Sequence, residues 1–288
     1  TPYRNAIVQA FPELENASLR PLTLGWHSVA IDADGRLIFK FPRGDAAAQA
    51  LRREARLLSA IRPRISMRVP DLTLIESPML FSVHAKIEGE HLVTEDYERL
   101  PDPARERLAE DLARFYAELH ALDPVAMRNA GATDILPWRS PQEIRLKALP
   151  LVPREHRRLC ERTIEAYEAM APDPLGNIYG FFDGHGWNMA FDHARQRING
   201  VYDFADSGFG PLHQDFVYSG FISLALTRMI ADRYARLTGK SIDRERIGIL
   251  AGMHRLSELA ELAGDRRNEL VARQALAFWA ANVDTVTL

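Results

Sequence analysis

"YGFFDGHGWNMAFD", residues 179–192, is the stretch on which the interpretation of this chain depends. It places an acid (Asp183), an imidazole (His185) and an amide (Asn188) within six residues, with two glycines between them. Glycine disfavours a helix and lets the backbone turn tightly, so we predict a loop. Such a loop is either a surface turn or a functional site, because Asp and Asn also occupy turns for local reasons.

A second acid follows this loop after a predicted hairpin. "NMAF" (188–191) and "INGVYDF" (198–204) have strand patterns, and Asp203 lies near the end of the second one. From about residue 215 the pattern is helical, with a break near Gly239. A strong amphipathic helix is also predicted before the loop, where apolar residues recur at steps of four and three: Leu108, Leu112, Phe115, Leu119 and Leu122.

The first third of the chain is richer in strands. "SVAIDADGRLIFKF" (28–41) predicts a hairpin with Asp-Gly turn chemistry. "AAAQALRREARLLSAI" (46–61) predicts a helix, and "DLTLIESPMLFSVHAKI" (71–87) predicts a second strand pair. We therefore predict an α+β fold with a small β-rich N-terminal lobe, residues 1–86, and a large α-helical C-terminal lobe, residues 87–288.

Two charged residues of the β-rich part form a predicted pair. Lys40 lies on a strand between two phenylalanines, and by itself it is better explained as a solvent-facing lysine of an edge strand. Glu54 lies three residues after Leu51 and four before Leu58, on the apolar face of its helix. A carboxylate on a buried stripe needs a partner, and Lys40 is a natural one. In kinases, a strand lysine oriented by a helix glutamate holds the phosphates of the nucleotide.

The order and spacing of Lys40, Glu54, Asp183, Asn188 and Asp203 match a kinase active site. In such a site the first acid of the loop orients or deprotonates a hydroxyl group, while the amide and the second acid bind magnesium. Each residue alone has an ordinary explanation as a turn or surface residue. The whole set in this order is much harder to explain by chance.

A metal hydrolase is the alternative enzyme. Asp183, His185 and Asp203 offer ligand types that hold a metal ion. This interpretation gives no role to Lys40 or Glu54, and the sequence contains no HExxH motif.

Composition limits the class of protein. The chain has 288 residues, 47% of them hydrophobic, which suffices for one or two domains with a sizeable core. The net charge of −3 gives no reason to expect nucleic acid as a partner. The lone Cys160 excludes an internal disulfide framework and is expected to pack in the core. The first residues lack a long apolar run and no apolar run is long enough to span a membrane, so we expect no signal peptide and a soluble, cytoplasmic protein.

At these residues the sequence resembles the aminoglycoside phosphotransferase family, which consists of small-molecule kinases with a bilobal protein-kinase-like fold. The resemblance is clearest in "LIFKFPRG", "REARLL", "KIEGEHL", "FFDGHGWNMAFD" and "INGVYDFADSGFGPLHQDF". The first of these is most similar to the aminoglycoside 2''-phosphotransferases. The fourth resembles a catalytic loop whose usual form is His-Gly-Asp-x-His-x-x-Asn.

The resemblance implies a role for each matching position, with Mg²⁺ as cofactor and ATP or GTP as phosphoryl donor. Asp183 would be the catalytic base, and Asn188 and Asp203 would bind the metal. Lys40 would hold the phosphates of the nucleotide and Glu54 would hold Lys40, while Ser28 belongs to the loop "GWHS" over the phosphates. The carbonyl of Ala85 and the amide of Ile87 would face the purine, with His84 behind it. Asp215 matches a later acid that usually braces the catalytic loop.

Two departures from the family pattern matter for the interpretation. Phe181 replaces the usual histidine, and we expect this aromatic ring to substitute for it by packing. The loop over the phosphates contains only Gly25. Phe182 and Trp187 are also expected to pack the catalytic loop onto the large lobe. A nucleotide-binding pseudokinase that acts through a partner remains an alternative, and Phe181 is the feature in its favour.

The acceptor implied by the resemblance is a small molecule, with an aminoglycoside antibiotic first and other alcohols such as choline, homoserine or methylthioribose as alternatives. An aminoglycoside is a polycation, so its site needs carboxylates beyond those of the catalytic set. Candidates are Asp206, Asp232, Glu88 and Glu90.

Overall fold

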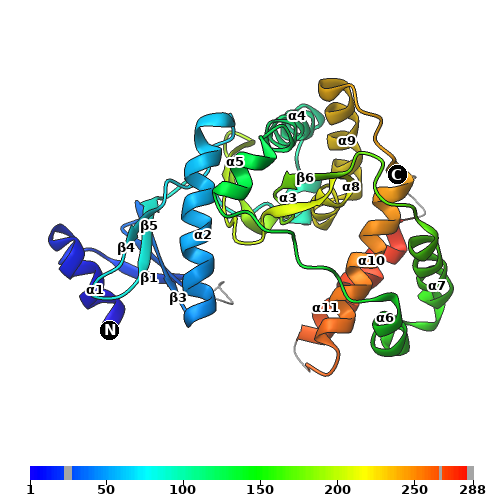
Figure 1. The fold of residues 1–288 in the computed structure, drawn as a ribbon, viewed down its shortest axis with the longest axis horizontal. Coiled ribbons are helices and arrows are strands. Elements are labelled where there is room, and N and C mark those ends of the chain that lie inside the picture. The colour runs from blue at the N-terminus through cyan, green and yellow to red at the C-terminus, as the bar shows by residue number, and fades with distance from the viewer. Residues whose placement is uncertain (23–27, 266–267, 284–288) are drawn as a thin grey trace. The chain divides into compact units, whose positions relative to one another are not determined.

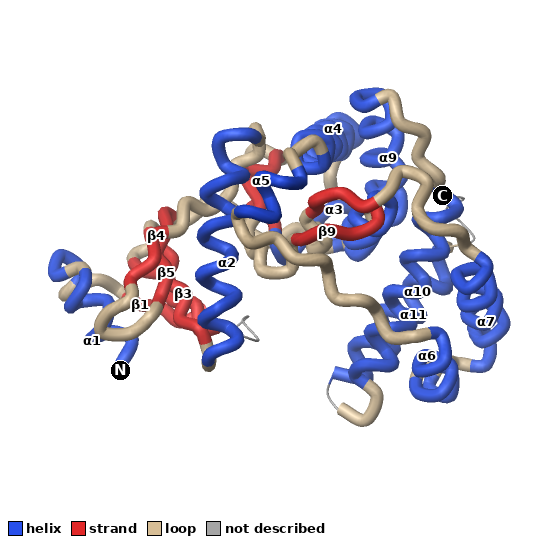
Figure 2. The backbone as a smooth tube through the Cα atoms, viewed as in Figure 1, coloured by secondary structure: helices blue, strands red, loops and turns tan. Residues whose placement is uncertain are grey.

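The structure is a computed structural model that describes residues 1–22, 28–265 and 268–283. The chain divides into two compact units. The first unit comprises Thr1–His91, Leu122–Thr133 and Asn188–Asp206, and the second comprises the intervening segments and the C-terminal part. The first unit contains most of the strands and the second is mainly helical, as the sequence predicts (Figures 1 and 2). The boundary between the two predicted lobes, at residues 86 and 87, stays a prediction.

An antiparallel sheet forms the centre of the first unit, with strand order β1-β2-β3-β5-β4. Its strands are β1 (Leu19–Leu22), β2 (Ser28–Ala33), β3 (Leu37–Pro42), β4 (Thr73–Ile75) and β5 (Phe81–Ala85). The β2–β3 hairpin is confirmed. At its turn Asp34 and Gly35 both have positive φ, 54° and 69°, which is the backbone of a tight hairpin turn and suits an Asp-Gly pair.

The helices of the first unit are α1 (Pro2–Ala10), η1 (Pro12–Leu14), α2 (Asp45–Ile61), η2 (Arg62–Arg64) and α5 (Pro124–Asn129). The predicted helix α2 is confirmed, and it runs beside the sheet (Figure 1). Phe39, Phe41 and Phe81 point to one face of the sheet and form a core with Ile7 of α1. Lys40 alternates with these phenylalanines and therefore points to the other face.

A second hairpin of the first unit consists of β7 (Met189–Asp192) and β8 (Arg197–Val201), which confirms the predicted strand pair. The segment after β5 approaches it closely: Glu90 and Phe191 exchange backbone hydrogen bonds of 2.9 and 2.8 Å. Gly89 makes this approach possible. A Cβ atom there would lie 2.6 Å from the carbonyl carbon of Ala190, and its φ of 139° is one that favours glycine.

The second unit has a short sheet of β6 (Asn177–Gly180) and β9 (Gly208–Pro211). Its helices are α3 (Thr94–Glu98), α4 (Asp102–His120), α6 (Pro141–Lys147), η3 (Leu149–Leu151), α7 (Arg154–Ala169), η4 (Gly186–Asn188), α8 (Leu212–Asp215), η5 (Val217–Phe221), α9 (Leu224–Thr238), α10 (Arg244–Leu262) and α11 (Asn268–Asn282). The predicted break is confirmed, because Gly239 ends α9 in the left-handed conformation.

Packing in the second unit follows the amphipathic patterns. Helix α4 packs against α9, and α10 packs against both α7 and α11. Cys160 of α7 is completely buried, as expected, in the cluster that contains Met253 and Leu256 of α10. Among the described residues, no helix is long and apolar enough to cross a membrane.

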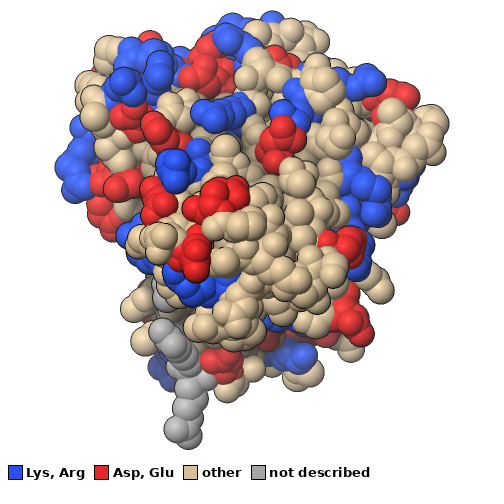
Figure 3. Space-filling view, turned by 90° about the vertical axis from the view of Figure 1, so that its left-hand side faces the viewer, with Lys and Arg blue, Asp and Glu red and all other residues tan. Residues whose placement is uncertain are grey.

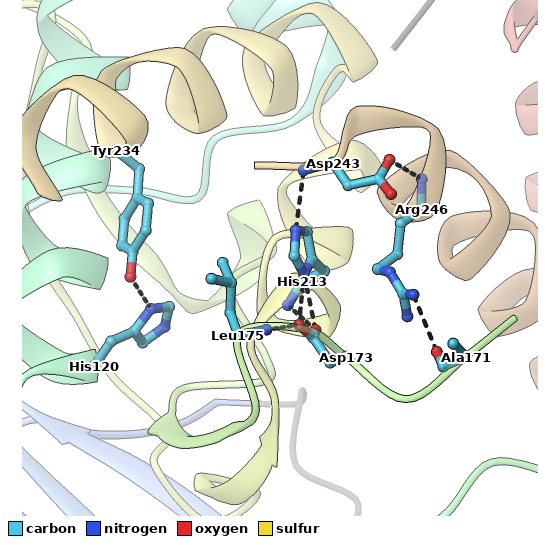
Figure 4. Close-up of polar contacts among 8 residues, drawn as sticks. All are labelled: His120, Ala171, Asp173, Leu175, His213, Tyr234, Asp243 and Arg246. Carbon is cyan, nitrogen blue, oxygen red and sulfur yellow. Dashed lines mark hydrogen bonds and ion pairs between the residues drawn. The ribbon is translucent and has the colours of Figure 1, made fainter. Parts of the chain in front are cut away.

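A buried carboxylate–imidazole pair ties three segments of the second unit together (Figure 4). Asp173, in the loop after α7, accepts hydrogen bonds of 2.9 Å from the backbone N–H groups of Leu175 and His213. His213 Nδ1 donates to the same carboxylate at 2.8 Å, and Nε2 accepts the backbone N–H of Asp243 at 3.0 Å. Both side chains of the pair are almost completely buried. The loop after α7, α8 and the start of α10 are thereby held as one piece.

We expect Asp173→Ala to lower the free energy of unfolding by about 2–4 kcal/mol, because it leaves several buried donors without an acceptor. Burial alone would raise the pKa of Asp173, but the hydrogen bonds from His213 and Leu175 lower it below the usual 3.8. The stabilisation is therefore present above pH 3.8 and is lost as the pH falls through the lower folded-state pKa.

Urea unfolding at pH 7 and at pH 3 measures this effect. The difference between wild type and variant should shrink at the lower pH. Asp102→Ala is the control, since that side chain is 90% exposed and its loss should change stability by less than about 1 kcal/mol. Equal losses in the two variants would contradict a stabilising role for the pair.

Candidate active site

Three of the predicted residues meet in the first unit. Lys40 Nζ lies 3.1 Å from Glu54 Oε2 and 3.0 Å from Asp203 Oδ1. Lys40 comes from β3, Glu54 from the buried face of α2, and Asp203 from the segment just after β8. The predicted Lys40–Glu54 contact is therefore present, and Asp203 completes it. In kinases, a strand lysine paired with a helix glutamate is the group that contacts the nucleotide phosphates.

The charges of this array set the protonation state of Lys40. Burial alone would lower the pKa of the ammonium group, but the charges of Glu54 and Asp203 outweigh it and raise the pKa above 10.5. Lys40 is therefore a fixed cation at neutral pH.

The second oxygen of Glu54 holds the segment that carries Asp203. Glu54 Oε1 accepts the backbone N–H of Phe204 at 3.0 Å, and Glu54 is only 3% exposed. Arg53, its neighbour on α2, donates to the carbonyl of Ala205 at 3.0 Å. Asp203 itself has a φ of 67°, a left-handed conformation that a non-glycine residue adopts at a cost of about 1–3 kcal/mol. These contacts with α2 stabilise that conformation.

Asn188 lies on the same hairpin as Asp203. Its backbone carbonyl accepts the N–H of Tyr202 at 3.0 Å, and its side chain is buried. The hairpin thus brings the amide next to the residue that precedes the acid. Amide and carboxylate oxygens are ligands that suit Mg²⁺, which keeps water and phosphate oxygens in its remaining positions.

The remaining nucleotide-site candidates line the sheet and the segment after it. Ser28 begins β2, is buried and pairs with Pro42; the loop before it, with Gly25, lies outside the described residues. His84 Nδ1 is 2.9 Å from the carbonyl oxygen of Ala85. Burial lowers the pKa of His84, and the charge of Lys40 adds to this. These groups lie on β2 and β5, beside the strand of Lys40.

The backbone after β5 is held by the adjacent residue. The side chain of Lys86 donates from Nζ to the buried carboxylate of Asp32 at 2.7 Å. The backbone N–H of Lys86 donates to the carbonyl of Arg36 at 2.8 Å. Ile87 is buried beside it. The two backbone groups predicted to face the purine, at Ala85 and Ile87, therefore flank a residue that is anchored to the β2–β3 hairpin.

Asp183 belongs to the second unit, in the loop between β6 and η4. The buried carboxylate of Asp215 braces the start of this loop by accepting the backbone N–H groups of Phe181 and Phe182 at 2.9 and 2.5 Å. His120 Nε2 lies 2.9 Å from Asp215. Figure 4 shows the other contact of this ring, in which His120 Nδ1 lies 3.0 Å from Tyr234 Oη. The loop is therefore held through its backbone.

The two phenylalanines before Asp183 replace the usual His-Gly pair in different ways. Phe181 is buried and contacts the ring of Phe115 edge to face, with 5.7 Å between the ring centroids, so the expected packing is present. Phe182 is buried with a φ of 53°, which favours glycine. Asp215 stabilises this conformation, and its side chain reaches the loop because residue 180 is glycine: a Cβ there would lie 2.4 Å from Asp215 Oδ2.

One packing expectation was wrong. Trp187 is 52% exposed, whereas Phe182 is buried as expected. The tight constraint in this part of the loop falls on Gly186, where a Cβ would lie 1.8 Å from the carbonyl oxygen of Leu92. The loop is thus fastened at the glycine, and the indole that follows is directed to the surface.

The sequence interpretation did not identify His120 or Arg53 as parts of the site. His120 had a usable signal: it lies on the buried face of α4, one residue after Leu119, and a buried polar group needs a partner. Arg53 had none, because its neighbour Ala205 is 152 residues away in the chain.

Two further observations concern metal ligands and surface charge. Among the described residues, no group of three or more His, Cys, Asp or Glu side chains could hold a metal ion. On the face drawn in Figure 3, basic and acidic side chains are intermingled.

The fold class is that of the kinase-like phosphotransferases. A comparison with protein families matches residues 18–259 to the phosphotransferase enzyme family, and the chain therefore belongs to this family. This confirms the resemblance to the aminoglycoside phosphotransferases and the prediction of a phosphotransferase with an alcohol group as acceptor. No curated protein sequence gave a match.

Solved structures show the same fold over nearly the whole chain. A GDP complex of a mutant aminoglycoside 2'-phosphotransferase-IIIa has a TM-score of 0.83 at 21% identity, covering 98% of this chain and 97% of that one. The streptomycin–ATP ternary complex of an APH(2'')-IIa has a TM-score of 0.65 at 19% identity, covering 96% and 95%. A macrolide 2'-phosphotransferase type I has a TM-score of 0.67 at 18% identity, covering 93% and 94%. These similarities confirm the predicted fold class.

We expect Glu54→Ala to lower the free energy of unfolding by about 2–3 kcal/mol, since it leaves the buried N–H of Phe204 without an acceptor and removes a partner of Lys40. Glu54→Gln keeps an acceptor for that N–H, so its loss should be smaller. Urea unfolding compares the variants with Glu76→Ala, which breaks an exposed pair with Arg52 and should cost little stability. Equal losses in the two Glu54 variants would show that the bond to Phe204 contributes nothing.

Proposed function

We propose that the protein is a magnesium-dependent small-molecule kinase that transfers the γ-phosphoryl group of ATP or GTP to a substrate hydroxyl, with an aminoglycoside as the first candidate acceptor. The array of Lys40, Glu54 and Asp203 carries this proposal. In this array the ammonium group of Lys40 lies beside the carboxylate of Asp203, whose side chain is 45% exposed. Kinases use such an arrangement to bind phosphates and metal.

The proposed nucleotide site lies in residues 1–86 and the segment just after them, with the C-terminal part, 87–288, supplying the base and the acceptor site. Lys40 would contact the α- and β-phosphates, and Glu54 would fix its position. Ser28 would cover the phosphates, while Ala85 and Ile87 would present backbone groups to the purine, with His84 behind it. ATP and GTP both stay open as donors, because the similar solved structures include a GDP complex and an ATP complex.

The donor set fits magnesium. Asn188 and Asp203 would hold Mg²⁺ through an amide and a carboxylate oxygen. When bound, the ion would neutralise charge on the β- and γ-phosphates. The anchoring of Phe204 to Glu54 keeps the carboxylate of Asp203 beside Lys40, so the protein supplies the metal ligand and the phosphate ligand from one connected group.

Asp183 would act on the acceptor. Its carboxylate would orient the substrate hydroxyl and take up its proton as the oxygen attacks the γ-phosphorus. The bond to the β–γ bridging oxygen breaks, and the nucleoside diphosphate leaves. Asp215, through the backbone of Phe181 and Phe182, would keep Asp183 in place during this step. We further propose that the protein acts in the cytoplasm, where nucleotides are available.

Asp183→Asn should lower kcat by about 10² or more, the size of a general-base contribution, with little change in nucleotide affinity. A phosphate-release assay with ATP and with GTP, across aminoglycosides and small alcohols, measures kcat, and calorimetry measures nucleotide binding. Asp71→Asn is the control, because that exposed acid pairs with Arg62 on the surface. Near-normal turnover in Asp183→Asn would remove Asp183 from the mechanism, and nucleotide binding without any turnover in wild type would favour the pseudokinase alternative.

Carboxylates outside the catalytic set support an aminoglycoside as the acceptor. Glu88 and Glu90 are exposed in the segment after β5, and Asp206 is exposed just after the metal-binding acid. Asp232 is the weakest of the four candidates, since it already forms an ion pair with Arg244 on the surface. Choline-, homoserine- or sugar-like alcohols stay the alternative acceptors.

If the acceptor is an aminoglycoside, its affinity should fall as salt rises, because exposed charge pairs are screened over about 10 Å at 0.1 M salt. Calorimetry with kanamycin and gentamicin at low and high salt, with nucleotide present, tests this. Glu88→Gln and Glu90→Gln should weaken binding at low salt, while Glu76→Gln, in an exposed pair elsewhere, should not. Absence of both heat and phosphate transfer with every aminoglycoside would leave a kinase of some other alcohol.

A further inference from the structure

His185 contacts the carboxylate of Asp183 directly. Its Nε2 lies 3.0 Å from Asp183 Oδ1, and both side chains are only about one-fifth exposed, 20% and 22%. The other ring nitrogen, Nδ1, is buried and has no hydrogen-bond partner among the described residues. A hydrogen on Nδ1 would be a buried donor without an acceptor, which is costly. The tautomer with its hydrogen on Nε2 is therefore favoured, and that hydrogen points to Asp183.

A stacked ring fixes the plane of this imidazole. The ring of Phe221 lies nearly parallel to that of His185, at an interplanar angle of 10° and a centroid separation of 6.0 Å. Phe221 is in turn covered by the guanidinium of Arg255, 3.5 Å from the ring centroid, and Arg255 is held by Glu258 at 2.9 Å. A cation over an aromatic face is attractive, more so when it is shielded from water.

The backbone around both rings is also fastened. The carbonyl of Phe221 accepts the hydroxyl of Thr94 at 3.3 Å, and the carbonyl of Gly186 accepts the N–H of Leu92 at 3.1 Å. His254 packs against Phe221 at 5.2 Å. Burial, with smaller effects of Arg255 and His185, lowers the pKa of His254 to about 3, so it adds no second cation to the cluster at neutral pH.

From this geometry we infer that His185, clamped by Phe221 and Arg255, is a positioning residue that fixes the rotamer of Asp183 by donating a hydrogen bond to Oδ1. The hydrogen bond from His185 thereby limits the rotation of the carboxylate that takes up the substrate proton in the proposed reaction. This inference rests on the proposed function, in which Asp183 is the base. His185 touches neither the nucleotide nor the acceptor in this scheme, so its effect must pass through Asp183.

The consequence is a coupling between the two residues that a purely structural histidine would not show. In the wild-type background, His185→Leu should lower kcat about tenfold or more, within the range that misplacement of a reacting group produces, while the KM for nucleotide stays unchanged. In an Asp183→Asn background the same change should have no further effect on kcat, because the group that His185 orients has lost its function. His185→Gln, which keeps an N–H donor, should restore much of the activity lost in His185→Leu.

The clamp is tested through Phe221. Phe221→Leu should lower kcat in the Asp183 background and have no effect in the Asp183→Asn background. Leu146→Ala is the control, since that apolar side chain is 74% exposed on α6 and has no role in the proposed scheme. Turnover of ATP and GTP is measured with Mg²⁺, with kanamycin as added acceptor and with water alone. Thermal unfolding with and without nucleotide identifies any variant that fails to fold, in which case His185→Gln carries the comparison.

The outcomes distinguish this inference from the proposed function on which it rests. A loss in kcat that appears only in the Asp183 background supports the positioning role. Losses of equal size in both backgrounds, or no loss at all in His185→Leu, would overturn it and leave the kinase proposal intact. Normal kcat in Asp183→Asn alone would overturn the catalytic assignment itself, and the role of His185 with it.

Discussion

The helical unit depends on the buried charge of Asp215. A carboxylate removed from water is stable only when its oxygens accept hydrogen bonds, and Asp215 obtains them from the backbone of Phe181 and Phe182 and from His120. The donors come from two separate parts of the chain, the loop before Asp183 and the end of α4, so satisfying the charge of Asp215 on α8 aligns these three segments. The pair of Asp173 and His213 extends the same arrangement from α8 to the start of α10. The position of the loop therefore follows from the need of the buried Asp215 carboxylate for hydrogen-bond donors.

The β-rich unit uses the same device at Glu54. One oxygen of this buried carboxylate fixes Lys40 and the other fixes the backbone of Phe204. The segment of Asp203 can then hold a left-handed conformation that is unfavourable for an aspartate. Each unit has a strained residue at a proposed functional group. In the helical unit it is Phe182, which precedes Asp183, and in the β-rich unit it is Asp203 itself. In both, a carboxylate that accepts backbone N–H groups stabilises the strain.

What the sequence could predict follows from how local each signal is. The Lys40–Glu54 contact was predictable, because a carboxylate on an apolar helix stripe has to find a cation and one lay on the preceding strand. The β2–β3 hairpin was predictable from its Asp-Gly turn. Helix α1 and strand β1 were not predicted, since neither has a long periodic pattern. The contact of Asp173 with His213 spans 40 residues and that of Arg53 with Ala205 spans 152, and no local pattern encodes either one.

The two phenylalanines show why a departure from a motif need not change the geometry of a site. The loop is held by the backbone N–H groups of residues 181 and 182, which every residue except proline provides. Phe181 replaces a polar contact by burial against Phe115. Phe182 has a conformational cost that glycine would avoid, but its ring is buried in the core of the helical unit, and burying a phenylalanine contributes about 1.5–3 kcal/mol. That gain is comparable to the strain of about 1–3 kcal/mol. Side-chain identity can therefore change at these positions while the carboxylate of Asp183 stays where the backbone places it.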